Sequence, residues 1–170
     1  MRINLGSGSY PLEGWLNIDA VDMNLGKFPW DFDDECADEL MASHVLEHFT
    51  RRDGVRFIGE CYRILKPGGV LHIAVPDMDR FITAHLENNF DVLKGYHWRD
   101  LNHLMGGDGG EPNPLQRHRY MYCMNSLAMT LAIAGFRVEK RFAPLDIDNH
   151  RYKPISLYVD AIKTQKGETV

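Results

Sequence analysis

Two periodicities of apolar residues divide this chain into short extended runs and longer helical stretches. The clearest helical stretch is Arg51 to Leu65, where apolar residues recur at spacings of three and four and form one stripe. Thr50 is a suitable N-cap for this helix. Lys66-Pro67-Gly68-Gly69 is expected to end it, because proline cannot continue a helix and glycine favours the C-cap.

The extended runs are rich in aliphatic residues. The predicted strands are Arg2–Leu5, Trp15–Ile18, Ala37–Ala42, Val70–Val75, Phe136–Phe142 and Pro154–Lys163. Val70–Val75 is nearly all apolar, which is typical of a strand covered on both faces in a parallel sheet. Two further helices are predicted, one capped by Asp77 and one opened by Asn125 or Ser126. Strands that alternate with helices indicate a doubly wound α/β sheet.

Length and composition are those of an ordinary globular protein. The chain has 170 residues, of which 44% are apolar and 25% charged, and this fits one domain. We expect a single domain over residues 1–163. Within it, residues 91–123 are expected to form an irregular insertion on the substrate side, and residues 164–170 to form a flexible tail.

The charge balance argues against polyanionic partners. The net charge is −5, so neither nucleic acid nor an anionic membrane is expected to bind. The N-terminus lacks an apolar core of signal-peptide length, and the most apolar stretch, Leu127 to Phe136, is too short to span a bilayer. Cys36, Cys61 and Cys123 form no CxxC pair, which argues against a disulfide framework or a cysteine zinc site. A cytoplasmic location is the expectation.

The ends of the predicted strands hold the candidate binding residues, because ligands in such sheets lie beyond the carboxyl ends of the strands. Gly6-Ser7-Gly8 follows the first strand, and glycine lets a ligand approach the backbone closely. Asp19 ends the second strand, where the two oxygens of a carboxylate suit the vicinal hydroxyls of a ribose. Ser43 to His48 and Pro76-Asp77 are expected to border the same crevice.

The first strand connection is too short for a dinucleotide site. Only residues 9–14 separate Gly8 from Trp15, whereas a parallel crossover usually takes about a dozen residues and contains a helix. No helix N-terminus is therefore expected to face a pyrophosphate, and Pro11 stands in place of the third glycine of the dinucleotide pattern. A ligand with a nucleoside and a positive centre but no phosphate, such as S-adenosylmethionine, fits better than NAD.

Four segments occur in an order that resembles a known family. They are Ile3–Ser9, Gly14–Asp22, Ala37–Phe49 and Cys61–Asp77. Together they resemble the class I S-adenosylmethionine-dependent methyltransferases of the type 11 kind, and residues 102–136 resemble small methyltransferases of that group more loosely. The resemblance implies a Rossmann-like, doubly wound α/β fold with a mostly parallel sheet and an antiparallel last strand. This sequence departs from the family by its short first crossover, so the fold is expected to be trimmed there.

The same resemblance implies the function. S-adenosylmethionine would be the cofactor, and a small polar molecule would accept the methyl group on oxygen or nitrogen. A module that binds S-adenosylmethionine or S-adenosylhomocysteine without turnover is the alternative. A nicotinamide-dependent oxidoreductase is a further rival, against which the short crossover and the missing glycine argue.

The resemblance also implies the cofactor contacts. Gly6, Ser7 and Gly8 would face the methionine end of the cofactor, and Asp19 the ribose. Adenine would lie near Met23-Asn24-Leu25, with Asn24 and Leu25 as the candidate contacts, or near Pro29-Trp30, although Phe28 and Trp30 are equally suited to the core. Ser43 and His44 would border the cofactor.

His44-Val45-Leu46-Glu47-His48 has the HxxEH spacing of some zinc peptidases. That chemistry needs both histidines on one helix face, whereas His44 is predicted at a strand end. A divalent ion held by His44, Glu47, His48 and His118 is an open alternative, since imidazole and carboxylate suit several metals. Loop histidines beside a cofactor cleft more often position substrate, so no metal is expected.

Residues 96–122 are irregular yet rich in aromatic side chains, and they are predicted to form a lid over the acceptor, hinged at residues 106–110. His118 is the candidate general base or acceptor ligand, because imidazole titrates near neutral pH. His44 and His48 are expected on the opposite wall. The alternative is that His118 is a solvated side chain between Arg117 and Arg119.

Overall fold

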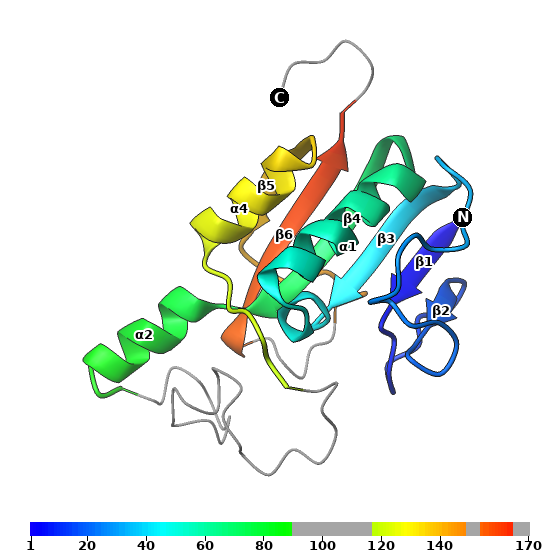
Figure 1. The fold of residues 1–170 in the computed structure, drawn as a ribbon. Coiled ribbons are helices and arrows are strands. Elements are labelled where there is room, and N and C mark those ends of the chain that lie inside the picture. Colours follow the sequence, from blue (N-terminus) through cyan, green and yellow to red (C-terminus); the bar gives the residue numbers. More distant parts are fainter. Residues whose placement is uncertain (90–116, 149–153, 165–170) are drawn as a thin grey trace.

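Figure 1 shows the computed structural model, which describes residues 1–89, 117–148 and 154–164. A six-stranded sheet has the strand order β2-β1-β3-β4-β6-β5. The strands are β1 (Arg2–Leu5), β2 (Leu16–Ile18), β3 (Ala37–Ser43), β4 (Leu65–Pro76), β5 (Phe136–Arg141) and β6 (Ser156–Lys163). The helical segments of the described part are η1 (Leu46–His48), α1 (Arg51–Ile64), α2 (Met78–Leu86) and α4 (Met124–Ile133).

One strand of the sheet runs against the others. β2, β1, β3 and β4 are parallel neighbours, whereas β6 is antiparallel to both β4 and β5. Helices α1 and α4 lie side by side across one face of the sheet (Figure 1) and bury Phe57, Cys61 and Leu127 there. The α/β Rossmann-like fold with an antiparallel last strand is confirmed.

The connection from β1 to β2 contains no helix, as predicted, and two asparagines hold it instead. The Oδ1 atom of Asn17 accepts hydrogen bonds from Nδ2 of Asn4 at 2.9 Å and from the backbone N–H of Leu12 at 2.8 Å. Its Nδ2 donates to the carbonyl of Leu12 at 2.9 Å, and Asn4 also donates to the carbonyl of Tyr10 at 3.2 Å. These side chains satisfy backbone groups that a helix would have satisfied internally.

The loop between β2 and β3 is fastened to α1. Trp30 is 3% exposed, packs edge-on against Phe57 with 5.3 Å between ring centroids, and donates from Nε1 to the carbonyl of Leu25. Its backbone N–H donates to Glu60, and its carbonyl accepts from the guanidinium of Arg63. Of the two roles considered for Trp30, a neighbour of adenine or a core residue, the structure shows the core residue.

The boundary between α1 and β4 differs from the prediction. The helix ends at Ile64, and β4 begins at Leu65, which pairs with Ala37. Lys66-Pro67-Gly68-Gly69 therefore lies within β4, at a register shift between Ala37 and Glu39, rather than in a separate loop.

The C-terminal boundaries shift by one or two residues. Helix α4 begins at Met124, and the backbone N–H of Cys123 donates to Oγ of Ser126 at 3.0 Å. β6 begins at Ser156, where Pro154 had been expected.

Some predictions fall outside the described residues. These are most of the insertion expected at residues 91–123, its hinge at residues 106–110, and the tail from residue 165. The single domain over residues 1–163 stays a prediction. Among the described helices, none is long and apolar enough to cross a membrane.

Candidate functional site

The turn after β1 contains two glycines in left-handed conformations. Gly6 has a φ of +68° and Gly8 a φ of +48°. A Cβ atom on Gly6 would lie 2.5 Å from Cγ2 of Val45, so packing requires glycine there. A Cβ atom on Gly8 would have no described heavy atom within 4 Å. The backbone at Gly8 therefore faces open space, which a ligand can approach.

Asp19 follows β2 at the same edge of the sheet, since Ile18 pairs with Leu5. Its backbone is fixed by Asp22, whose Oδ2 accepts from the Asp19 N–H at 2.9 Å. The partly exposed carboxylate of Asp19 accepts no hydrogen bond from the described residues. It therefore keeps its acceptor capacity for a ligand.

The two residues predicted near adenine have different environments. Asn24 is exposed, and its Oδ1 accepts from the backbone N–H of Gly26 at 2.9 Å, as in a side-chain-capped turn. Leu25 is 8% exposed and belongs to the hydrophobic core. At this place the exposed groups of the turn, rather than the Leu25 side chain, are open to a ligand.

Ser43 and His44 stand at the carboxyl end of β3. The hydroxyl of Ser43 is buried and has no hydrogen-bond partner in the described part of the chain. His44 has a φ of +55°, which is uncommon for a residue with a Cβ and occurs at functional sites. Its ring is held on both sides, because Nδ1 lies 3.1 Å from Oε1 of Glu47 and Nε2 lies 2.8 Å from Oγ of Ser156.

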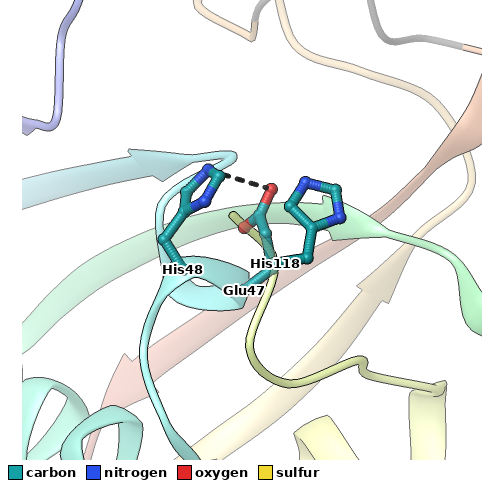
Figure 2. Close-up of side chains that lie close together, drawn as sticks. All are labelled: Glu47, His48 and His118. Carbon is teal, nitrogen blue, oxygen red and sulfur yellow. Dashed lines mark ion pairs between the residues drawn. The ribbon is translucent and has the colours of Figure 1, made fainter. Parts of the chain in front are cut away.

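Glu47, in η1, joins the three predicted histidines. Its carboxylate is fully buried and lies between the rings of His48 and His118 (Figure 2). Nε2 of His48 is 4.0 Å from Oε1 of Glu47, and the His48 and His118 ring centroids are 5.1 Å apart. His118 is only 9% exposed, so it is not the solvated side chain that the sequence also allowed.

Backbone hydrogen bonds attach the His118 segment to η1. The carbonyl of Glu47 accepts from the N–H of Arg119 at 2.7 Å and of Tyr120 at 3.2 Å. Nδ1 of His48 lies 3.3 Å from the carbonyl oxygen of Arg117. These hydrogen bonds hold His48 and His118, which are distant in the sequence, on either side of the Glu47 carboxylate.

The Glu47 carboxyl is held ionised. Burial alone would raise its pKa, but the hydrogen bond from His44 and the charges that His44, His48 and His118 can carry outweigh burial and lower the pKa. A fully buried negative charge therefore sits among three imidazoles, which favours a proton or another cation at this place.

One residue of the site, Ser156, was not among the predicted functional residues. Glu47 was named only as a ligand of the divalent ion that the sequence left open as an alternative. Ser156 carried no signal, because its place beside His44 depends on the insertion of β6 next to β4. The glycine turn and the histidines share one edge of the sheet, and Val45, which packs against Gly6, links them.

Comparisons with known proteins agree on the type of domain. Residues 6–73 match the family model Methyltransf_11, described as a methyltransferase domain. A Mycolicibacterium smegmatis protein, named as a probable S-adenosylmethionine-dependent methyltransferase, is 31% identical over 85 residues. The match covers 50% of this chain but only 30% of that relative.

Solved structures share the fold. A methyltransferase from Archaeoglobus fulgidus superposes with a TM-score of 0.60 at 14% identity, over 95% of this chain and 85% of the other. A 1,6-didemethyltoxoflavin N1-methyltransferase from Burkholderia thailandensis gives 0.59 at 14% identity, over 96% and 71%. The name of the Mycolicibacterium smegmatis relative gives S-adenosylmethionine as that protein's methyl donor. Residues 6–73 thus resemble a methyltransferase domain in sequence, and the chain shares the fold of solved S-adenosylmethionine-dependent methyltransferases.

Proposed function

We propose that this chain transfers a methyl group from S-adenosylmethionine to an oxygen or nitrogen of a small polar molecule. The strongest support is that the glycine turn after β1 and the carboxylate of Asp19 lie at the same edge of the sheet, and that both are accessible to a ligand as far as the described residues show. Within the described residues, nothing blocks the approach to Gly8, and no group donates a hydrogen bond to the carboxylate oxygens of Asp19. Both features fit a cofactor with a ribose and no phosphate.

The cofactor contacts follow from these positions. Gly6, Ser7 and Gly8 border the methionine end, Asp19 accepts hydrogen bonds from the ribose hydroxyls, and the Asn24-Leu25 turn lies toward adenine. The buried hydroxyl of Ser43 and the ring of His44 border the cofactor from β3. When bound, S-adenosylmethionine supplies an activated methyl group, because its sulfonium leaves as a neutral thioether.

The histidines form the acceptor side of the site. His44 is a positioning residue, because both of its ring nitrogens contact protein side chains. His118 is the proposed general base, and His48 completes the wall beside it. The protein's main contribution is to hold the acceptor in line with the methyl group, which is a proximity effect.

Two neighbours in fold have names that point to small acceptors. One is the 1,6-didemethyltoxoflavin N1-methyltransferase, and the other is a Thermotoga maritima protein described as a possible histamine N-methyltransferase, with a TM-score of 0.55. The latter is 17% identical over 96% of this chain and 82% of its own. These names motivate a screen of small polar acceptors for this chain.

Calorimetric titration with S-adenosylhomocysteine tests the cofactor site. Asp19→Ala is expected to weaken binding roughly 10- to 100-fold, on the order of 1–3 kcal/mol, because a charge-assisted hydrogen bond is lost. Asp33→Ala, which removes an exposed carboxylate farther along the same β2–β3 loop, is the control and should bind like the wild type. Unchanged affinity in Asp19→Ala would refute the ribose assignment.

A screen of sugars, nucleotide sugars, amines and small acids for methyl transfer tests the activity. With an acceptor identified, His118→Ala is expected to lower turnover and to leave S-adenosylhomocysteine affinity nearly unchanged. Full turnover by His118→Ala would remove the base assignment. Tight cofactor binding without transfer to any acceptor would instead favour the alternative, a non-catalytic binding module.

A further inference from the structure

We propose that Glu47, His48 and His118 bind a divalent transition-metal ion, with Zn²⁺ as the type ion. This proposal concerns ion binding and stands whether or not the chain transfers methyl groups. One ligand atom from each residue lies within 4.8 Å of the others, and Figure 2 shows the carboxylate between the two imidazoles. Two imidazoles and one carboxylate form a donor set that zinc and iron take in proteins.

The hydrogen bonding of His48 fixes which nitrogen can bind an ion. Nδ1 of His48 lies 3.3 Å from the Arg117 carbonyl oxygen, which can only accept, so Nδ1 carries the hydrogen. In the neutral ring the lone pair is then on Nε2, the nitrogen that faces Glu47. Metal-binding histidines typically donate their other ring N–H to a carbonyl or carboxylate in this way.

The separation of the two ligand atoms suits an ion between them. Nε2 of His48 and Oε1 of Glu47 are 4.0 Å apart, which is too long for a hydrogen bond. Two metal–ligand bonds of roughly 2.0–2.2 Å each span up to about 4.2 Å, and less at a tetrahedral angle. An ion therefore fits between these atoms with a small inward movement of the side chains.

The state of Glu47 adds an independent reason. Its carboxylate is fully buried, and its Oε2 atom accepts no hydrogen bond from the described residues. A buried, incompletely paired carboxylate is costly, and a bound cation would offset that cost. Nδ1 of His44 lies 3.1 Å from Oε1 of Glu47 and thereby helps to orient the carboxylate, as outer-sphere partners do.

The backbone prepares the site before any ion binds. The carbonyl of Glu47 accepts from the N–H groups of Arg119 and Tyr120, which keeps the His118 segment beside η1. Three protein ligands leave a fourth position open, as in catalytic zinc sites. The His48 side chain is 24% exposed, which gives the cluster access to solvent.

An ion at this cluster and the base role of His118 are alternative states of one site. Both need an imidazole lone pair, so ion binding displaces any proton there. If methyl transfer occurs here, the ion would bind the acceptor's oxygen and lower the pKa of that hydroxyl, and the released proton would pass to solvent water instead of to His118. That consequence rests on the proposed function, whereas ion binding itself does not.

The test is calorimetric titration of Zn²⁺ into chelator-treated wild-type protein, followed by the absorption spectrum of the Co²⁺ form. We expect one ion per chain, and about a 100-fold or greater loss of affinity in His48→Ala and in His118→Ala. Glu47→Gln keeps the shape of the side chain and removes the charge, and it should lose affinity equally. His85→Ala, on the exposed face of α2, is the control and should bind like the wild type.

Two further measurements distinguish loss of the metal site from loss of folding and from loss of cofactor binding. Thermal melts of every variant show whether it is folded, and S-adenosylhomocysteine titration of the same samples reports the cofactor site. Zn²⁺ affinity that is the same in wild type and in the His48→Ala/His118→Ala double variant, with both folded, would overturn the proposal. Wild-type protein that binds no Zn²⁺ would overturn it as well.

Discussion

At Gly6 the backbone conformation and the packing both exclude a side chain. The φ of +68° costs a residue with a Cβ about 1–2 kcal/mol, and the contact with Val45 adds an overpacking cost of roughly 1–3 kcal/mol. Gly6→Ala should therefore lower the free energy of unfolding by about 2–5 kcal/mol in urea denaturation. Gly8→Ala meets only the backbone cost and is the matched comparison.

A second variant identifies the cause. Val45→Ala in the Gly6→Ala background removes the atom that the new Cβ would strike, so part of the lost stability should return. If Gly6→Ala is as stable as Gly8→Ala, the close contact with Val45 is not what requires glycine at that position.

Some features of single residues could not be predicted from the sequence. Gly6 and Gly8 look alike in the sequence, and a ligand turn could be predicted from their pattern and place. Their different reasons for being glycine could not, because Val45 approaches only one of them. In the same way, the spacing of His44, Glu47 and His48 was visible, but the positive φ of His44 was not.

Among the elements, β4, β5 and β6 are joined by a charged network as well as by backbone pairing. His72 and Asp160 are direct cross-strand partners, with Nδ1 and Oδ1 2.8 Å apart, and Arg141 contacts the same oxygen at 2.6 Å. Arg141 also pairs with the buried Asp148. Burial would raise the pKa of Asp160, but the His72 hydrogen bond and the Arg141 charge outweigh burial and lower it.

This shift gives a pH-dependent prediction. Because the folded state lowers the pKa of Asp160 below the unfolded value of 3.8, its stabilising effect is complete above that value. The effect is lost as pH falls through the lower, folded pKa. Asp160→Asn should therefore destabilise the protein at pH 7, by roughly 1–2 kcal/mol, and this difference should shrink below about pH 4. Urea denaturation across that pH range measures it, and a difference independent of pH would contradict the ionic account.

Most elements were predictable from local patterns, because apolar periodicity and capping residues act over a few positions. Thr50 caps α1, and its side chain accepts from the N–H of Asp53. The entry into β4 was not predictable in this way, since the Lys66–Gly69 segment has the residues of a helix terminator. Pairing of Leu65 with Ala37, a contact between distant residues, decides its structure.

For the molecule as a whole, β6 is the strand on which the sheet depends. It pairs with β4 on one side and β5 on the other, and β5 has no other strand neighbour in the described sheet. A chain that stops after residue 148 lacks β6 and should lose cooperative unfolding, because the apolar edge of β4 is left open. A chain that stops after Thr164 keeps all six strands and is the control. Circular dichroism melts measure the difference, and a sharp transition in the shorter chain would contradict this dependence.

The position of β6 between β4 and β5 sets an order of events in folding. Val70 in β4 pairs with Ile162 in β6, so the middle of the sheet closes only when residues more than half the chain length apart meet. Closing so long a loop is slow compared with forming α1 or the β1–β3 pairing. Until it happens, β4 presents an unpaired, mostly apolar edge to other chains. Refolding yield should therefore fall as protein concentration rises, and the time spent waiting for β6 is when this protein is most prone to aggregate.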